Sequence, residues 1–124
     1  MPANGPNLNA PALEIVFDGI YWVKHAQNQD VPAIRNHLSK LWDMTLKSSD
    51  ITTTQRLIAE FEWWFFVANP TARGAASLGD LLSLSLQISK GLKLRNEFLH
   101  MDWFALSRSL DDYVSWRLSL GTKN

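Results

Sequence analysis

Apolar residues recur along this chain at steps of three and four, the spacing that places them on one face of an α-helix. This spacing predicts five helices, over residues 11–27, 30–47, 51–68, 77–100 and 103–120. Because the links between them are short, we expect the helices to pack together as a single-domain all-α bundle. Residues 1–10 are expected to form a flexible N-terminal arm, residues 11–120 the helical domain and residues 121–124 a C-terminal tail.

Local signals set several of these boundaries. Asp50 is a favourable N-cap for the helix that begins at residue 51. That helix is expected to end before Asn69-Pro70, because the residue before a proline leaves the helical region. Gly91 is a weak point inside the helix predicted over residues 77–100. Two segments also fit short strands as an alternative to a helix. They are residues 14–17 and the alternating serines and leucines of residues 83–89.

The helix predicted over residues 51–68 is unusually aromatic. Phe61, Trp63, Trp64, Phe65 and Phe66 surround it with more apolar surface than a single core is expected to cover. At helical spacing among other apolar residues, such tryptophans are more typical of a core or an interface than of stacking on bases. We therefore expect Trp63, Trp64 and Phe66 to lie in the interface of a homodimer.

The helix predicted over residues 77–100 is expected to turn one apolar face to the core. That face contains Leu81, Leu84, Ile88 and Leu92. The sequence thus predicts that shortening Leu84 destabilises the fold.

The charges balance, with 12 basic and 12 acidic residues and a formal net charge of zero. The chain therefore lacks the strongly basic composition of a general nucleic-acid binder, and any contact with RNA must come from a local patch. In the last predicted helix, Asp111-Asp112 lie near Arg108 and Arg117, a pattern that favours a solvated, ion-paired face.

Several classes of chemistry have no support in the sequence. The chain has no cysteine, which excludes disulfides, thiolate nucleophiles and cysteine metal sites. It has no glycine-rich phosphate loop and no Gly-x-Ser-x-Gly turn. His25 and His37 lack carboxylates at metal-site spacing, so no metal and no cofactor are expected. Without a signal-peptide pattern or a membrane-length apolar run, a cytoplasmic location and no membrane contact are expected.

A short polar segment carries the strongest hint of chemistry. Residues 95–100 read Arg-Asn-Glu-Phe-Leu-His and interrupt an otherwise apolar stretch. Arginine binds phosphate bidentately, and histidine transfers protons near neutral pH. Asn96 and His100 are four residues apart and share a helix face, and the long side chain of Arg95 can reach the same face.

This segment resembles the Arg-Asn-x-x-x-His signature of the HEPN superfamily, the higher eukaryote and prokaryote nucleotide-binding domains. The resemblance implies an all-α, metal-independent endoribonuclease of the kind found in toxin–antitoxin systems, or an inactive relative that keeps the architecture. It implies that His100 transfers the proton during attack by the RNA 2′-hydroxyl, that Arg95 stabilises the developing charge and that Asn96 orients the phosphate, with Glu97 in a supporting role. It also implies a homodimer, an RNA substrate and an antitoxin protein as partner.

A different class of function stays open from the same residues. The protein is then a non-enzymatic dimeric helical interaction or ligand-binding module, in which the polar segment is structural. A helical bundle with surplus aromatic residues can enclose an apolar cavity, which favours ligand binding. No sequence motif supports this alternative.

Overall fold

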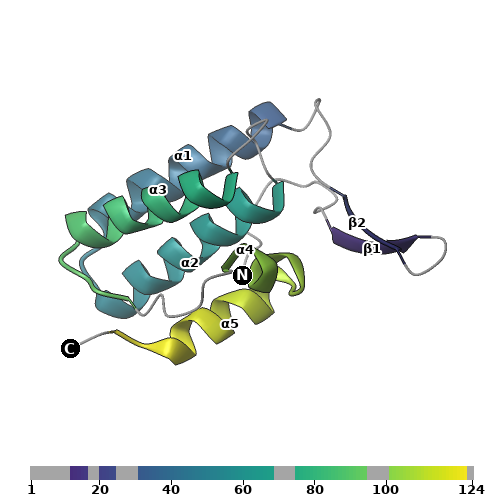
Figure 1. Cartoon of the computed structure of the whole chain (residues 1–124). Coiled ribbons are helices and arrows are strands. Elements are labelled where there is room, and N and C mark those ends of the chain that lie inside the picture. The colour runs from purple at the N-terminus through teal and green to yellow at the C-terminus, as the bar shows by residue number, and fades with distance from the viewer. Residues whose placement is uncertain (1–11, 17–19, 25–30, 69–74, 95–100, 123–124) are drawn as a thin grey trace.

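The computed structural model describes residues 12–16, 20–24, 31–68, 75–94 and 101–122. The described residues form an all-α bundle of five helices preceded by one antiparallel hairpin (Figure 1). The helices are α1 (Val31–Lys47), α2 (Ile51–Ala68), α3 (Ala75–Ser89), α4 (Met101–Leu106) and α5 (Leu110–Leu120), and the strands are β1 (Ala12–Val16) and β2 (Ile20–Lys24). The sequence prediction of a small all-α bundle is confirmed. None of the helices in these ranges is long and apolar enough to cross a membrane.

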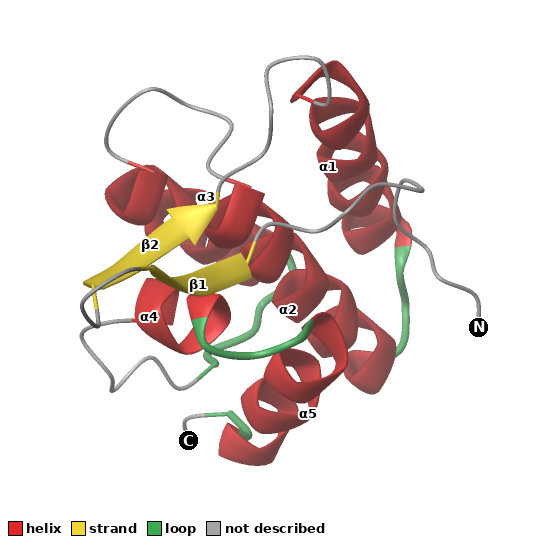
Figure 2. Cartoon of the chain, turned by 90° about the vertical axis from the view of Figure 1, so that its right-hand side faces the viewer, coloured by secondary structure: helices red, strands yellow, loops and turns green. Residues whose placement is uncertain are grey.

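The most aromatic helix, α2, occupies the centre of the bundle. It contacts α1 and α3 on one side and α4 and α5 on the other (Figures 1 and 2). Every residue from Phe61 to Ala68 is consequently buried. Trp63, Trp64 and Phe66 are only 4%, 5% and 4% exposed within a single chain. The premise that one core cannot cover this helix is therefore wrong, and the homodimer predicted from it remains untested.

The prediction of a helix over residues 11–27 is wrong. Residues 12–16 and 20–24 instead pair as antiparallel strands, with Leu13 opposite Val23 and Ile15 opposite Tyr21. The strand alternative noted for residues 14–17 was the better one. A further signal was Asp18-Gly19, a dipeptide that is common in hairpin turns.

The helix predicted to run to residue 100 ends at Ser89. The amide of Leu92 donates to the carbonyl of Gln87, and the amide of Gly91 donates to the carbonyl of Ile88. These two bonds form a Schellman motif, whose C′ residue requires a left-handed backbone. Gly91 has a φ of 67° and meets that requirement. Gly91 is thus the stop signal of α3 rather than a weak point inside it.

Helix α3 presents a different face to the core from the one that its leucines predicted. Ser83, Leu86 and Gln87 are buried, whereas Leu84 and Ile88 are 46% and 69% exposed. The prediction that Leu84 is a core residue is wrong. The apolar spacing failed here because the core side of α3 meets a buried carboxylate on α2, which selects polar partners.

The helix predicted over residues 103–120 is two helices. The Ser109 hydroxyl accepts a hydrogen bond from the amide of Asp112 and caps α5. The Trp63 indole N–H donates to the carbonyl of Arg108 at 3.0 Å, which ties the break between α4 and α5 to the central helix. The N-cap predicted at Asp50 is confirmed, since its carboxylate accepts from the amide of Thr53 at 2.8 Å.

We predict that Gly79→Ala destabilises the protein, although alanine normally favours a helix. A Cβ at Gly79 would lie 2.5 Å from one ring carbon of Phe66 and 3.0 Å from one of Phe65. Overpacking of this kind costs about 1 to 3 kcal/mol, more than the ~1 kcal/mol that alanine gains over glycine in a helix. Urea unfolding measures the net loss.

The matched control is the same substitution in a Phe66→Leu background, where the smaller side chain leaves space. There, Gly79→Ala should cost less or become stabilising. An equal loss in both backgrounds would contradict a steric origin.

Candidate functional site

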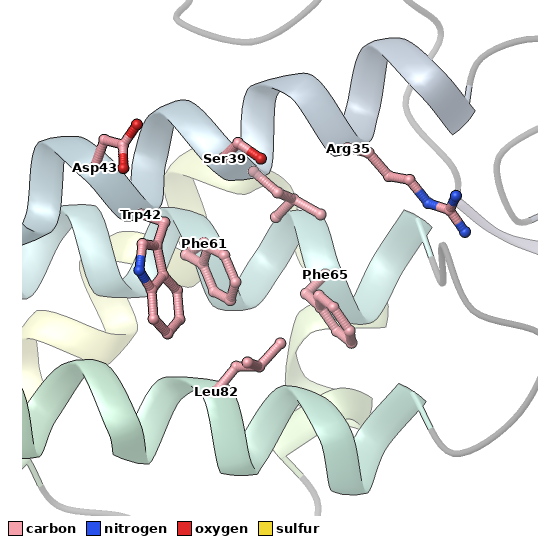
Figure 3. Close-up of a pocket in the computed structure, with 8 residues that line it drawn as sticks. Arg35, Ser39, Trp42, Asp43, Phe61, Phe65 and Leu82 are labelled. Carbon is pink, nitrogen blue, oxygen red and sulfur yellow. The ribbon is translucent and has the colours of Figure 1, made fainter.

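A pocket of about 560 Å³ opens between α1 and α3, above α2 (Figure 3). Its residues come from three successive helices, α1, α2 and α3. The lining consists of Arg35, Leu38, Ser39, Trp42, Asp43, Phe61, Phe65 and Leu82. A volume of this size lies in the range typical of small-molecule and side-chain binding sites.

The apolar part of the pocket is a set of packed aromatic rings. The centroids of Trp42 and Phe61 are 5.7 Å apart, and those of Phe61 and Phe65 are 6.0 Å apart. Phe61 and Phe65 are buried, whereas Trp42 is half-buried. Figure 3 shows these rings directed toward the space between α1 and α3, with Leu82 on the α3 side. The buried rings are held by the core, so this surface exists before a ligand binds.

The polar part of the pocket comes from one stripe of α1. Arg35, Ser39 and Asp43 follow one another at four-residue steps and therefore share a face of the helix. Figure 3 shows Arg35 and Asp43 at opposite ends of the pocket. From Arg35 to Asp43 the helix rises about 12 Å. The rim thus changes from a cation through a hydroxyl to an anion along its length.

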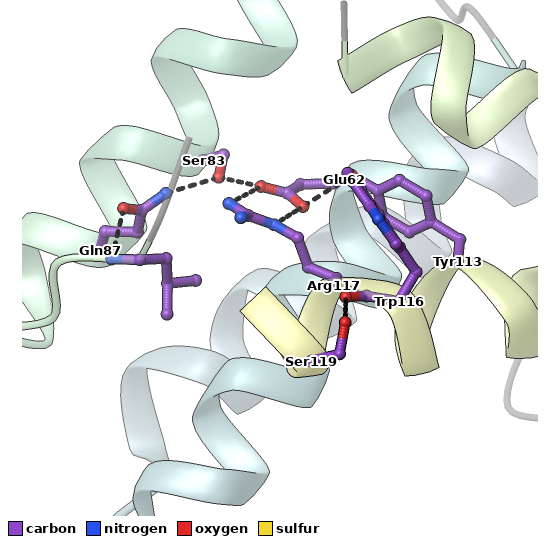
Figure 4. A network of polar contacts seen from close by, with 8 residues as sticks. Glu62, Ser83, Gln87, Tyr113, Trp116, Arg117 and Ser119 are labelled. Carbon is purple, nitrogen blue, oxygen red and sulfur yellow. Dashed lines mark hydrogen bonds and ion pairs between the residues drawn. The ribbon is translucent and has the colours of Figure 1, made fainter. Parts of the chain in front are cut away.

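A second cluster of polar residues is buried beside α2 (Figure 4). The Glu62 carboxylate accepts hydrogen bonds from Arg117 Nε at 2.8 Å, Arg117 Nη2 at 3.1 Å and the Tyr113 hydroxyl at 2.9 Å. The Ser83 hydroxyl donates to the same carboxylate, and Gln87 donates to Ser83. The side-chain oxygen of Gln87 accepts from the amide of Leu94. One carboxylate therefore links α2, α3 and α5.

The electrostatics of this cluster follow from its burial. Burial and the Glu62 carboxylate raise the pKa of Tyr113 well above its usual value. Burial alone would lower the pKa of Arg117, but the charge of Glu62 and its hydrogen bond raise it above the usual value. Glu62 and Arg117 are 2% and 3% exposed and bind one another, so we assign the cluster a structural role.

Arg117 corrects the sequence interpretation of the last helix. It was expected on a solvated, ion-paired face with Arg108 and Asp111-Asp112, but it is buried against Glu62. Arg108 lies over the rings of Phe104 and Trp116, at 4.7 Å and 5.4 Å from their centroids. The apolar run of α2 contains two carboxylates, Glu60 and Glu62, and no local pattern distinguishes the buried Glu62 from the half-buried Glu60.

Most of the other residues singled out from the sequence lie outside the part of the chain that the structure describes. Arg95, Asn96, Glu97 and His100 lie outside the described residues, as does His25. The His37 ring contacts Trp64 edge-on at 5.3 Å, and burial, with a smaller contribution from Lys40, lowers its pKa. Within the described ranges, no three His, Asp or Glu side chains are grouped so that they could hold a metal ion.

Comparison with known proteins changes the functional assignment. The model of a family described as AvrB_AvrC, Avirulence protein, matches residues 18–120. None of the curated proteins compared with this chain matches it.

The HEPN resemblance is therefore wrong, and with it the ribonuclease and toxin–antitoxin assignments. A pattern with three fixed positions, Arg95, Asn96 and His100, arises by chance too easily to outweigh a match along most of the sequence. Since the matched range covers more than half of the residues, the chain belongs to the AvrB_AvrC avirulence protein family.

Proposed function

We propose that this protein acts by binding rather than by catalysis, and that the pocket between α1 and α3 receives an apolar group of its ligand or partner. The observation that carries the proposal is the composition of the pocket. A preformed aromatic surface lies beneath a rim that offers a cation, a hydroxyl and an anion in sequence. Apolar walls with a few placed polar groups are typical of ligand sites.

The lining of the pocket favours binding over chemistry. It contains no histidine, cysteine or lysine, and its serine and carboxylate, Ser39 and Asp43, are both exposed on α1, where burial does not activate them. The buried Glu62 cluster offers no alternative, because its carboxylate is occupied by Arg117, Tyr113 and Ser83. These features support a binding module.

The shape and chemistry of the pocket define the ligand group. Trp42, Phe61 and Phe65 suit a flat aromatic or bulky aliphatic group, which gains from burial and from ring contacts. The rim of α1 suits a polar extension that runs along the helix, with a negative group toward Arg35 or a positive group toward Asp43. An aromatic anion meets these requirements in a small molecule.

The test uses 8-anilinonaphthalene-1-sulfonate, an aromatic anion whose fluorescence rises in apolar surroundings. Titration of the folded protein should show saturable binding. Trp42→Ala and Leu82→Ala should each weaken that binding by at least about tenfold, because each removes part of the apolar surface. Circular dichroism verifies that both variants are folded.

Two exposed apolar residues outside the pocket provide matched controls. Ile51→Ala and Met44→Ala, at side chains that are 62% and 52% exposed, should leave the affinity unchanged. Equal losses at the control and pocket positions, or no loss at Trp42 and Leu82, would overturn the proposal.

A further inference from the structure

The charged residues at the two ends of the pocket differ in how they are bonded. Arg35 takes part in an interaction within its own chain. At the opposite end, the exposed Asp43 carboxylate forms no hydrogen bond or ion pair with the described part of the chain. Lys40 and Lys47 lie about one turn before and after Asp43 on α1, yet neither forms an ion pair with it. A ligand with a positive group therefore meets an unpaired counter-charge at the Asp43 end.

The aromatic walls nearest Asp43 are inclined to one another. Figure 3 shows Trp42 together with Asp43 at the end of the pocket opposite Arg35. The ring planes of Trp42 and Phe61 make an angle of 60°. Two inclined rings suit a rounded group that touches both, whereas a flat ring can stack on only one of them. This end of the pocket thus favours a bulky aliphatic group over a flat aromatic one.

Ring faces also attract positive charge. The electrons of an aromatic ring give its face a negative potential, which is strongest for tryptophan. Trp42 is half-buried, and Phe61 and Phe65 are buried, so a group that enters beside them loses much of its contact with water. The attraction between a cation and a ring increases when water is excluded. The rings and the Asp43 carboxylate therefore favour the same sign of charge.

The lining offers few acceptors for N–H groups. Ser39 and Asp43 are its uncharged and charged side-chain acceptors, and both are exposed on α1 rather than placed among the rings. A lysine ammonium carries three N–H donors and an arginine guanidinium five. Donors held against the rings would stay unsatisfied, which is costly. A fully alkylated ammonium carries the same charge without any N–H group, and its methyl groups gain from burial.

We propose that the end of the pocket formed by Trp42 and Asp43 binds a fully alkylated ammonium group, such as trimethylammonium. This inference rests on the binding role proposed above for the same pocket. The methyl groups contact the rings of Trp42 and Phe61, and Asp43 supplies the counter-charge at the rim. Arg35 repels a cation from the opposite end, which orients the ligand.

Three small alcohols test the charge and the methyl groups separately. Choline carries trimethylammonium, and 3,3-dimethyl-1-butanol has the same shape with a carbon atom in place of the nitrogen, so that it is neutral. Ethanolamine keeps the positive charge but has N–H groups in place of the methyl groups. Titration followed by NMR chemical shifts of the protein measures each affinity. Choline should bind at least about fivefold more tightly than either of the others.

Two variants test the assigned residues. Trp42→Leu removes the ring but keeps an apolar side chain, and Asp43→Asn removes the charge. Each should weaken choline binding at least about threefold and weaken 3,3-dimethyl-1-butanol binding less. Asp111→Asn is the matched control, since it removes an exposed carboxylate on α5, outside the pocket lining, and should leave the affinity for choline unchanged. Circular dichroism verifies that the variants are folded.

The same group occurs in free molecules and on methylated lysine side chains of proteins. A short peptide that contains trimethyllysine is therefore titrated beside choline, with the unmethylated peptide as its control. Tighter binding of the methylated peptide than of choline identifies a protein as the source of the group. Tighter binding of choline identifies a small molecule.

The outcomes separate this inference from the binding role of the pocket. Equal affinities for choline and 3,3-dimethyl-1-butanol, or no binding of choline by protein that binds 8-anilinonaphthalene-1-sulfonate in the pocket, would overturn the cationic ligand alone. Equal affinities for choline and ethanolamine would overturn the requirement for alkylation. Equal losses for Asp43→Asn and Asp111→Asn would overturn the role of Asp43. Failure of the pocket itself would instead appear as sulfonate binding that is insensitive to Trp42→Ala and Leu82→Ala.

Discussion

Replacement of Glu62 by glutamine should destabilise the folded protein by about 3 to 5 kcal/mol, the usual cost of breaking a buried ion pair by removing one partner. The guanidinium of Arg117 is 3% exposed and would remain in the core without its counter-ion. The Tyr113 and Ser83 hydroxyls would also lose their charged acceptor. Urea unfolding followed by circular dichroism measures the change.

Two further variants separate the charge effect from loss of packing. Glu62→Leu combined with Arg117→Met removes both charges and should be more stable than Glu62→Gln, because no buried charge is left unpaired. Glu60→Gln changes a half-buried carboxylate on the same helix and should cost less than about 1 kcal/mol. If Glu62→Gln costs no more than Glu60→Gln, the cluster does not stabilise the fold as we infer.

Local sequence signals predicted α1 and α2 well, since the expected ranges 30–47 and 51–68 agree with Val31–Lys47 and Ile51–Ala68. The predicted start of α2 at residue 51 and its end at residue 68 agree with the structure, because an aspartate cap and a proline set them. The end of α3 is also set by a local signal, Gly91. The sequence analysis interpreted this glycine as a weak point rather than as the left-handed residue of a Schellman motif. Of the hairpin, only a short strand over residues 14–17 was noted, as an alternative, since five-residue strands carry too short a pattern to outweigh a helical one.

The residues that form the Glu62 cluster and the pocket could not be predicted from such local signals. Glu62 and Arg117 are separated by 55 positions, and the partners Ser83 and Tyr113 lie on two different helices. No local pattern reveals which helices will enclose a single carboxylate. The pocket likewise depends on how α1 and α3 pack against α2, so its aromatic residues were interpreted only as core or interface.

The face of α3 is where pattern and structure disagree most directly. The leucines at positions 81 and 84 predicted the buried side, yet Ser83 and Gln87 are buried and Leu84 is exposed. Polar residues face the core because Glu62 supplies an acceptor for Ser83, which in turn accepts from Gln87. The leucines that remain outside then form an exposed apolar stripe on α3.

Substitution by alanine should therefore have very different effects on the free energy of unfolding at Leu84 and Leu86, although these residues are only two positions apart on α3. Leu86 is 0% exposed, and Leu86→Ala should cost about 2 to 5 kcal/mol through lost burial and the cavity that it leaves. Leu84 is 46% exposed, and Leu84→Ala should change the stability of the monomer by no more than about 0.5 kcal/mol.

Urea unfolding followed by circular dichroism measures the two losses. A large loss for Leu84→Ala would mean that this side chain supports the core. A small loss for Leu86→Ala would contradict the orientation of α3 on which both the Glu62 cluster and the exposed stripe depend.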